Sequence, residues 1–211
     1  MKPEPRNSVD NGTALWALVD YAVSVVDDPW REDPWLKSMT ATQAFVVCVG
    51  AGPWKIGRRR KIQMEALNRI GPHDLFKPTL GFLGSYPLTW QNSMVQHLHE
   101  YLQEQRKTMT DFCASLKDPK ALYAAAGCPK GTKVLSLFVR DYLGLPAFPV
   151  DRHVRRVLKE FNLPCKEDEL VALCDSMDYD ASKVASLLVR YGSGDNNLNP
   201  RDLLKDVSHG S

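Results

Sequence analysis

Apolar residues recur at helical spacing along most of this chain, and the alternation typical of strands is almost absent. In the segment 14–26, for example, Leu15, Leu18 and Ala22 fall on one face of a helix, because side chains three or four positions apart lie together. Stretches with proline and glycine, such as DDPWREDPW and GAGP, separate these segments because proline ends a helix. The pattern therefore predicts an all-α fold of roughly ten helices.

Two of the expected helix starts before residue 120 carry a capping residue. Asp118 followed by Pro119 is typical of an N-cap and a first helical residue. Thr42 is expected to cap the apolar helix 44–49 in the same way. The remaining helices are predicted over residues 55–70, 89–106, 119–126, 132–143, 151–161, 180–190 and 200–207.

The composition limits the possible partners. The 211 residues include 27 Lys and Arg and 25 Asp and Glu, so a nucleic-acid partner requires positive charge gathered on one face. No run approaches the roughly 18 apolar residues of a membrane span, and the N-terminus lacks the pattern of a secretory signal. We therefore expect an intracellular chain without a membrane partner, in the cytoplasm or nucleoid of a prokaryote or the nucleus of a eukaryote. The five cysteines form no CxxC pair and are expected to be free thiols.

The stretch from Cys128 to His153, CPKGTKVLSLFVRDYLGLPAFPVDRH, contains the candidate site. The segment AAAGCPKGTK, residues 124–133, overlaps the start of this stretch. It joins two helices through a tight turn, which is a helix-hairpin-helix pattern. Backbone N–H groups near Gly131 and at the start of the next helix would face outward at a positive helix end and bind phosphate without reading sequence. An ordinary turn between two helices is the alternative. If the turn binds DNA, the contacting residues are Lys130, Gly131 and Thr132.

The side chains of Lys133 and Asp151 are expected to converge. The helix from Lys133 to Leu143 is about 16 Å long, and the eight residues GLPAFPVD, kept extended by two prolines, cover up to roughly 26 Å. The run can therefore return along the helix and bring Asp151, as the N-cap of the next helix, beside Lys133.

This pair has a chemical use. The positive end of a helix would lower the pKa of Lys133, although a carboxylate very close to the amine would raise it. A partly neutral amine can form a Schiff base with a sugar C1′, and an adjacent carboxylate can stabilise positive charge on the sugar and help to move protons. A surface lysine and a capping aspartate without catalytic roles are the alternative.

The segment KGTKVLSLFVRDYLGLPAFPVDRHVRRV resembles the helix-hairpin-helix, Gly/Pro-rich, Asp-containing DNA glycosylases. GTKV and PVDRH are most similar to the 8-oxoguanine branch of this superfamily, whereas the separation of Lys133 and Asp151 is more similar to the endonuclease III branch. Upstream, LGSYPLTWQNSMVQHLHEYLQEQ resembles the Gly-x-Tyr segment and the long helix before the hairpin. QAFVVCVGAGPWK is similar to the first barrel helix and the duplex-probing loop. The likeness covers residues 42–157.

The resemblance implies a base-excision enzyme that acts on double-stranded DNA containing a damaged base. Lys133 matches the nucleophile of the bifunctional members, and Asp151 matches the aspartate of the family. The damaged nucleotide would be flipped into a cleft between two helical lobes. Residues 38–133 would form a six-helix-barrel-like lobe that ends in the hairpin, and residues 1–37 with 134–211 would form the other lobe.

The resemblance also bears on substrate and cofactor. An oxidised base is the expected substrate, with 8-oxoguanine slightly favoured. An oxidised pyrimidine, an alkylated base, and a DNA-binding module without catalysis are the alternatives. The chain is expected to act as a monomer without a cofactor, because the tail LLVRYGSGDNNLNPRDLLKDV lacks the four clustered cysteines that are usual in the endonuclease III branch.

Two further departures concern the DNA contacts. Pro129 replaces the first glycine of the hairpin and removes one N–H donor. Gly52 stands at the duplex-probing position, which is often Gln or Asn in the family, and a glycine cannot fill the gap left by a flipped base. Trp54 is the nearby candidate for that role, and Trp54 and Trp90 can each stack on an extruded base, with core packing as the favoured alternative.

Basic residues near these motifs have two interpretations. The segment KIGRRRKIQ forms either a DNA-facing patch or a solvated helix face. Arg152, Arg155 and Arg156 are stronger phosphate candidates because they lie next to Asp151 in the sequence. His153 is expected either to contact DNA or to be a hydrogen-bonded structural histidine.

Overall fold

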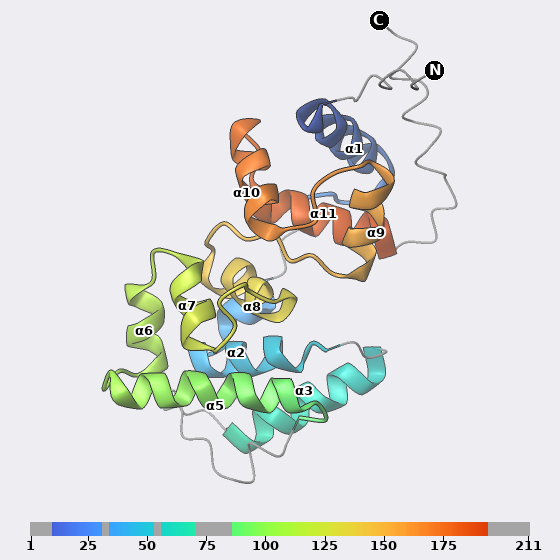
Figure 1. Ribbon diagram of the computed structural model, residues 1–211. Helices are drawn as coiled ribbons and strands as arrows, with labels where there is room; N and C mark the ends of the chain where they lie inside the picture. The colour runs from blue at the N-terminus through green and yellow to red at the C-terminus, as the bar shows by residue number, and fades with distance from the viewer. Residues whose placement is uncertain (1–9, 31–33, 53–55, 71–85, 194–211) are drawn as a thin grey trace, which may run out of the picture. The chain divides into compact units, whose positions relative to one another are not determined.

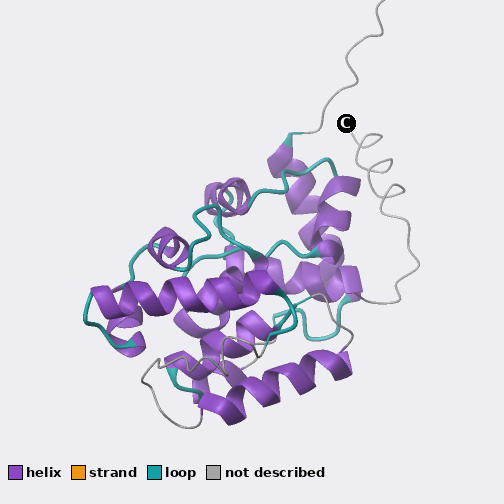
Figure 2. Cartoon of the chain, turned by 60° about the horizontal axis from the view of Figure 1, so that its bottom comes forward, coloured by secondary structure: helices purple, strands orange, loops and turns teal. Residues whose placement is uncertain are grey.

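The computed structural model describes residues 10–30, 34–52, 56–70 and 86–193. Within these ranges it contains ten α-helices and shorter helical turns, and no strand (Figures 1 and 2). The all-α prediction is therefore confirmed for the described part of the chain. Contacts divide the chain into two compact units, Met1–Arg31 with Val150–Ser211, and Glu32–Pro149. The described residues 10–30 and 150–193 thus belong to the same unit.

The first unit is organised around its last described helix, α11. This helix packs against the other three described helices of the unit, and its buried face includes Leu187. The ring of Tyr191 meets that of Tyr21 edge to face, with centroids 5.9 Å apart, and the guanidinium of Arg190 donates to the carbonyl groups of residues 28 and 29. The four helices are α1 (Asn11–Val25), α9 (Arg152–Glu160), α10 (Glu167–Ser176) and α11 (Ala181–Ser193).

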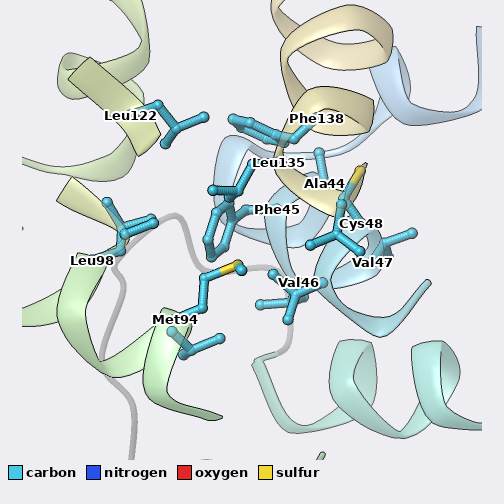
Figure 3. Packing of buried hydrophobic residues seen from close by; sticks show 14 of the residues in the cluster. Ala44, Phe45, Val46, Val47, Cys48, Met94, Leu98, Leu122, Leu135 and Phe138 are labelled. Carbon is cyan, nitrogen blue, oxygen red and sulfur yellow. The ribbon is translucent and has the colours of Figure 1, made fainter. Parts of the chain in front are cut away.

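The second unit is organised around α2, which packs against α3, α5, α6 and α8. Every residue of α2 except Gln43 is buried, as expected for a helix that is apolar on all sides. Figure 3 shows Phe45 of α2 among side chains of the surrounding helices, and its ring lies 5.5 Å from that of Phe138. The described elements are a 3-10 turn (Pro34–Ser38), α2 (Ala41–Gly50), α3 (Ile56–Ile70), α5 (Thr89–Glu104), α6 (Met109–Ser115), α7 (Pro119–Ala125) and α8 (Lys133–Phe138), which continues as a wide π-helical turn (Val139–Leu143).

The start of α2 corrects the predicted cap. Thr40, not Thr42, is the N-cap, because its hydroxyl accepts the N–H of Gln43 while the Gln43 side chain accepts the N–H of Thr40, at 3.2 and 3.0 Å. This reciprocal pair is a capping box. Thr42 lies inside the helix and is buried.

Four helices end in the same hydrogen-bonding pattern. In each, the residue after the C-cap has a positive φ and donates to the third residue before it, and the next N–H reaches back five residues. This is the Schellman motif, which satisfies carbonyl groups that the helix leaves unpaired. The positive-φ residues are Arg106 after α5, Gly127 after α7, Asn162 after α9 and Asp178 after α10, with φ of 51°, 70°, 55° and 59°.

Some element predictions differ from the structure. Helices α6 and α10 were not predicted, and the predicted helix 200–207 lies outside the described residues. The predicted helix 132–143 is α8 with its wide turn. The predicted division into lobes after residues 37 and 133 stays a prediction; contacts group α8 and its wide turn with Glu32–Pro149. The reason is that α8 packs against α2, and its wide turn against the 3-10 turn Pro34–Ser38.

No helix in the described ranges is both long and apolar enough to cross a membrane. The same residues contain no group of three or more His, Cys, Asp or Glu side chains that could hold a metal ion. All five cysteines are free thiols. Cys48 and Cys174 are buried, and the other three are partly buried.

Candidate functional site

The turn between α7 and α8 is built from two glycines with positive φ. Gly127 ends α7, and the N–H of Cys128 donates to the carbonyl of Tyr123 at 2.8 Å. Four residues later, Gly131 has φ 70°, and its N–H donates to the carbonyl of Cys128 at 2.7 Å. A residue with a side chain is strained at such φ values, so glycine allows the chain to reverse here. The turn therefore presents residues 129–132 between the two helices.

The start of α8 follows directly from this turn. Thr132 is the N-cap, and its hydroxyl accepts the N–H of Leu135 at 3.4 Å. Lys133 is thus the first residue of α8 and is partly buried, while Lys130 in the turn is exposed. The hydroxyl groups of Tyr123 and Ser136 lie 3.3 Å apart and connect α7 to α8. These contacts place the Lys133 backbone at a helix N-terminus, as the sequence predicted.

One expected donor of the turn is already used. The N–H of Gly131 was predicted to face outward, but it donates within the turn to Cys128. Pro129 has no N–H. In the first turn of α8, the N–H of Leu135 is also used, because it donates to the hydroxyl of Thr132.

Asp151 caps α9 as predicted. Its Oδ1 accepts the N–H groups of His153 and Val154 at 2.8 and 2.9 Å, and its own carbonyl accepts the N–H of Arg155 at 2.8 Å. The side chain is partly buried, while Arg152 and Arg155 are exposed. A carboxylate oxygen is fixed in this way at the positive end of α9.

His153 and Arg156 connect the first turn of α9 to α11. His153 Nδ1 lies 3.2 Å and Arg156 Nη2 lies 2.7 Å from the carbonyl oxygen of Gly192. Arg152 Nε donates to His153 Nε2 at 3.1 Å. The interpretation of His153 as a hydrogen-bonded histidine therefore agrees with these contacts.

The end of α2 is held by side chains that come from other elements. Gln63 Nε2 donates to the carbonyl of Val47 at 2.9 Å, and Gln91 Nε2 donates to that of Val49 at 2.6 Å. The hydroxyl of Tyr86 donates to the carbonyl of residue 46 at 2.9 Å. Gln91 is fully buried, and its Oε1 has no hydrogen-bond partner. Three side chains thus fix the backbone that leads into the predicted duplex-probing segment.

The predicted wedge residues lie at or near this end. Gly52 is buried after α2, and Trp54 lies outside the described residues. Trp90 is in the first turn of α5 and remains 42% exposed. Core packing, the favoured interpretation of Trp90, is therefore wrong, and a contact with a partner molecule stays available to it.

The basic segment lies on α3. Arg58, Lys61 and Arg69 are exposed, while Ile62 and Ala66 are buried, and the helix packs on α2. A helix with one apolar and one charged face has this pattern. The exposed face is compatible with a DNA-facing patch and with a solvated surface, so both interpretations stay open.

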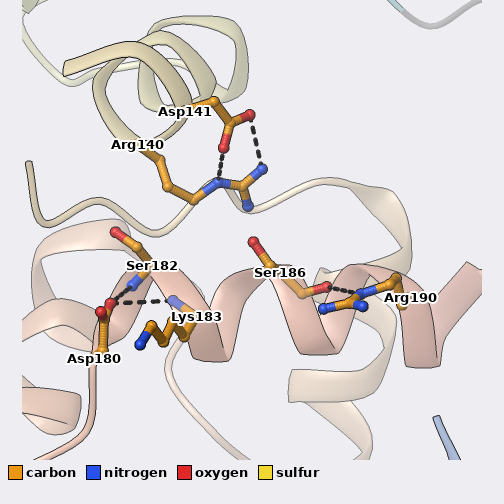
Figure 4. A network of polar contacts seen from close by, with 7 residues as sticks. All are labelled: Arg140, Asp141, Asp180, Ser182, Lys183, Ser186 and Arg190. Carbon is orange, nitrogen blue, oxygen red and sulfur yellow. Dashed lines mark hydrogen bonds and ion pairs between the residues drawn. The ribbon is translucent and has the colours of Figure 1, made fainter. Parts of the chain in front are cut away.

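Figure 4 shows two clusters of polar contacts that involve none of the predicted site residues. In the wide turn after α8, Arg140 Nε and Nη2 donate to the two carboxylate oxygens of Asp141 at 2.5 and 3.0 Å. At the start of α11, Asp180 Oδ1 accepts the N–H groups of Ser182 and Lys183 at 2.9 and 3.1 Å. The contacts of Asp180 satisfy local backbone groups, so we assign them to structure, whereas Arg140 Nη1 is buried without a hydrogen-bond partner.

The structure brings the predicted residues together in two groups. Lys130, Gly131, Thr132 and Lys133 form one continuous turn and helix start in the second unit, and the residues from Asp151 to Arg155 form the first turn of α9 in the first unit. The convergence of Lys133 and Asp151 concerns two different units and stays a prediction.

Comparison of the chain with protein-family models, with curated proteins and with solved structures gives no match. The assignment of function therefore depends on the residues of the chain itself. The roles of Gln63, Tyr86 and Gln91 were not predicted, because each side chain contacts a carbonyl between 16 and 42 positions away. No local signal in the sequence identifies such contacts.

Proposed function

We propose that the chain is a bifunctional DNA glycosylase with AP lyase activity, which removes an oxidised base from double-stranded DNA, with 8-oxoguanine favoured. One observation carries the proposal: the two residues that match the catalytic pair both lie at helix starts. Lys133 is the first residue of α8, and Asp151 is the N-cap of α9. The proposal includes a helix-hairpin-helix at α7 and α8, and two lobes with a cleft that accepts the flipped nucleotide.

The proposed chemistry uses Lys133 as the nucleophile. Its neutral Nζ bonds to C1′ of the sugar while the bond from C1′ to the base breaks, and the base leaves with the bonding electrons and takes up a proton. Opening of the sugar ring gives the Schiff base. Loss of a proton from C2′ then expels the 3′ phosphate by β-elimination.

Asp151 has an electrostatic role in this scheme. Positive charge develops on the sugar as the base leaves, and a carboxylate held in place stabilises that charge without having to reorganise. The two backbone donors on its Oδ1 hold the side chain in one orientation. Asp151 is also the residue that the proposal assigns to proton transfer.

The proposed DNA contacts surround these two residues. Lys130 is exposed in the turn before α8, and Arg152 and Arg155 are exposed on α9, so each can meet a phosphate. Thr132 and the first turn of α8 supply backbone donors of the kind that bind phosphate. Trp90 is the exposed aromatic residue proposed to stack on a base.

A trapping experiment tests the proposal. Borohydride reduces a Schiff base to a stable amine, so wild-type protein is expected to become covalently joined to duplex DNA that contains 8-oxoguanine. Lys133→Gln should abolish the joined product while binding to the same DNA stays within about threefold, since the exposed Lys130 contact remains.

Lys130→Gln is the matched control, because Lys130 lies three residues earlier in the same turn and is exposed. It should weaken binding modestly and leave trapping intact at saturating protein. Trapping that survives Lys133→Gln but is lost in Lys130→Gln would contradict the proposed nucleophile.

A second candidate function is a DNA-binding module without catalysis. Pro129 and the internal use of the Gly131 N–H favour it, because both remove donors from the turn. Duplexes that carry 8-oxoguanine, thymine glycol or an alkylated base separate the candidates. Strand cleavage without alkali indicates a lyase, cleavage only after alkali indicates a glycosylase without lyase activity, and binding without any cleavage indicates the module.

A further inference from the structure

The carbonyl group of Gly192 is the point at which two side chains of α9 meet α11. This carbonyl belongs to the last turn of α11, where a helix leaves carbonyl groups without an intrahelical partner. Arg156 Nη2 donates to it at 2.7 Å, and His153 Nδ1 lies at 3.2 Å. The negative end of the helix favours such donors.

The contact with Arg152 indicates which ring nitrogen of His153 accepts a hydrogen bond. A guanidinium nitrogen can only donate, and Arg152 Nε lies 3.1 Å from His153 Nε2. Nε2 must therefore be the acceptor and carry no proton. A neutral imidazole has one N–H, so the proton is on Nδ1, which donates to Gly192.

The backbones of α9 and α11 approach closely at the same place. A Cβ atom added to Gly192 would lie 3.1 Å from the carbonyl oxygen of His153 and 3.2 Å from Cγ2 of Val157. Both contacts are tighter than an ordinary van der Waals contact. The first turn of α9 is therefore packed against α11 as well as hydrogen-bonded to it.

We infer that His153 and Arg156 are positioning residues for Asp151. Anchored on the carbonyl of Gly192, they hold the first turn of α9, whose N–H groups at residues 153 and 154 in turn hold Oδ1 of Asp151. The inference rests on the proposed function for its catalytic meaning. In this inference His153 anchors α9 to α11 through the hydrogen bond from Nδ1 to Gly192, and its imidazole does not contact a DNA phosphate.

Two substitutions distinguish these roles. The amide nitrogen of Asn is bonded to Cγ, as Nδ1 of His is, whereas the amide nitrogen of Gln is one bond further out, as Nε2 is. His153→Asn can therefore keep the donor to Gly192, and His153→Gln can keep only a group in the position of Nε2. The two variants test Nδ1 and Nε2 separately.

The first measurement is the single-turnover rate of base release from DNA with 8-oxoguanine, beside the affinity for the same duplex. We expect His153→Asn to stay within about threefold of wild type and His153→Gln to lose up to about 100-fold in rate, as a small misplacement of a catalytic group can cost. Affinity should be unchanged in both. Arg156→Gln should lose rate in the same way, and Lys159→Gln, at an exposed position near the end of the same helix, should not.

The second measurement needs no activity. In the protein without DNA, ¹⁵N spectra of the His153 ring should show a protonated Nδ1 and an unprotonated Nε2. His153→Gln should lose protection against hydrogen exchange at the amides of residues 153 and 154, and His153→Asn should keep it. Unfolding by urea checks that each variant is folded.

The outcomes separate this inference from the proposed function. If the wild type releases no base from any lesion but the spectra and the exchange pattern are as expected, the proposed function fails and the anchoring role stands. A proton on Nε2, exchange that is equal in the two variants, or a loss of DNA affinity in His153→Asn alone would overturn the inference.

Discussion

Among single residues, Asp151 combines a structural and a proposed catalytic duty. Its Oδ1 accepts two N–H groups of the first turn of α9, which any good N-cap can do. The proposed electrostatic role needs negative charge as well. The two duties can therefore be separated by a substitution that keeps the oxygen and removes the charge.

Asp151→Asn is that substitution. Asn is about as good an N-cap as Asp, so the free energy of unfolding in urea should change by less than about 1 kcal/mol. Base release should slow by several orders of magnitude if the carboxylate stabilises the developing charge. Asp151→Ala serves as the control, since it should also lose about 1 kcal/mol of stability. An Asn variant that is folded and fully active would refute the catalytic role.

The residue-level predictions succeeded where the contact is local. Asp118 and Asp151 cap helices through N–H groups two or three positions further along, so sequence spacing identified both. The prediction of Thr42 as N-cap was wrong. Thr40 has Gln43 three positions later, and the capping box formed by this spacing sets the helix start. Gln63 and Gln91 act across long separations, which spacing cannot reveal.

Among the elements, helix ends are fixed more by hydrogen bonds than by residue type. The Schellman pattern requires a positive φ, which glycine adopts without strain. Only α7 has glycine there, while α5, α9 and α10 use Arg106, Asn162 and Asp178. Arg106 and Asp178 therefore carry backbone strain that a glycine would relieve.

Arg106→Gly is expected to stabilise the protein by roughly 0.5–1 kcal/mol, because the cost of a left-handed residue exceeds the added entropy of glycine in the unfolded chain. Asp178→Gly should act in the same direction. The measurement is the urea midpoint of unfolding. Gln105→Gly is the matched control, since Gln105 has an ordinary right-handed conformation, with φ −80° and ψ −5°, and should destabilise. Equal destabilisation by Arg106→Gly and Gln105→Gly would contradict the strain argument.

Element prediction was limited by length and by continuity. The helix α6 has seven residues, too few for a periodic apolar pattern to stand out. The wide turn Val139–Leu143 follows α8 without a break in the apolar pattern, so the sequence predicts one continuous helix. By contrast, Gly127 and Gly131 indicated the turn between α7 and α8 in the sequence. Both have φ 70° in the structure, a conformation that favours glycine.

At the scale of the whole molecule, the two groups of predicted site residues belong to different units. The second unit supplies the turn with Lys133, and the first unit supplies Asp151. Sequence analysis predicted each local arrangement, since each depends on a few neighbouring residues. The division of the chain was less predictable, because it depends on which helix α8 packs against.

Several buried groups give the whole fold a common response to alkaline pH. Burial, with a smaller effect from Asp180, raises the pKa of the Cys174 thiol from 9.0 to about 12, and burial likewise raises the pKa of Tyr179 and Tyr191. The unfolded chain releases the Cys174 proton near pH 9, while the folded chain keeps it until about pH 12. The folded state then binds more protons, so the free energy of unfolding falls as pH rises through this window.

The urea midpoint should therefore be lower at about pH 10 than at about pH 8. In Cys174→Ala the difference between the two midpoints should shrink, although that variant also loses packing and starts from a lower stability at both pH values. A midpoint that rises with pH over this range, or a difference unaffected by Cys174→Ala, would show that the buried thiol does not contribute.

The joining of α1 to α11 has a consequence for biosynthesis. The ribosome releases Leu15 and Leu18 about 160 residues before α11, the helix that α1 packs against, and this interval takes roughly 10–30 s at ordinary rates of elongation. During that interval Glu32–Pro149 can already collapse around α2, whereas α1 still lacks α11, the described helix against which it packs. The nascent chain thus exposes the apolar face of α1, which a holdase chaperone would protect until α11 is made.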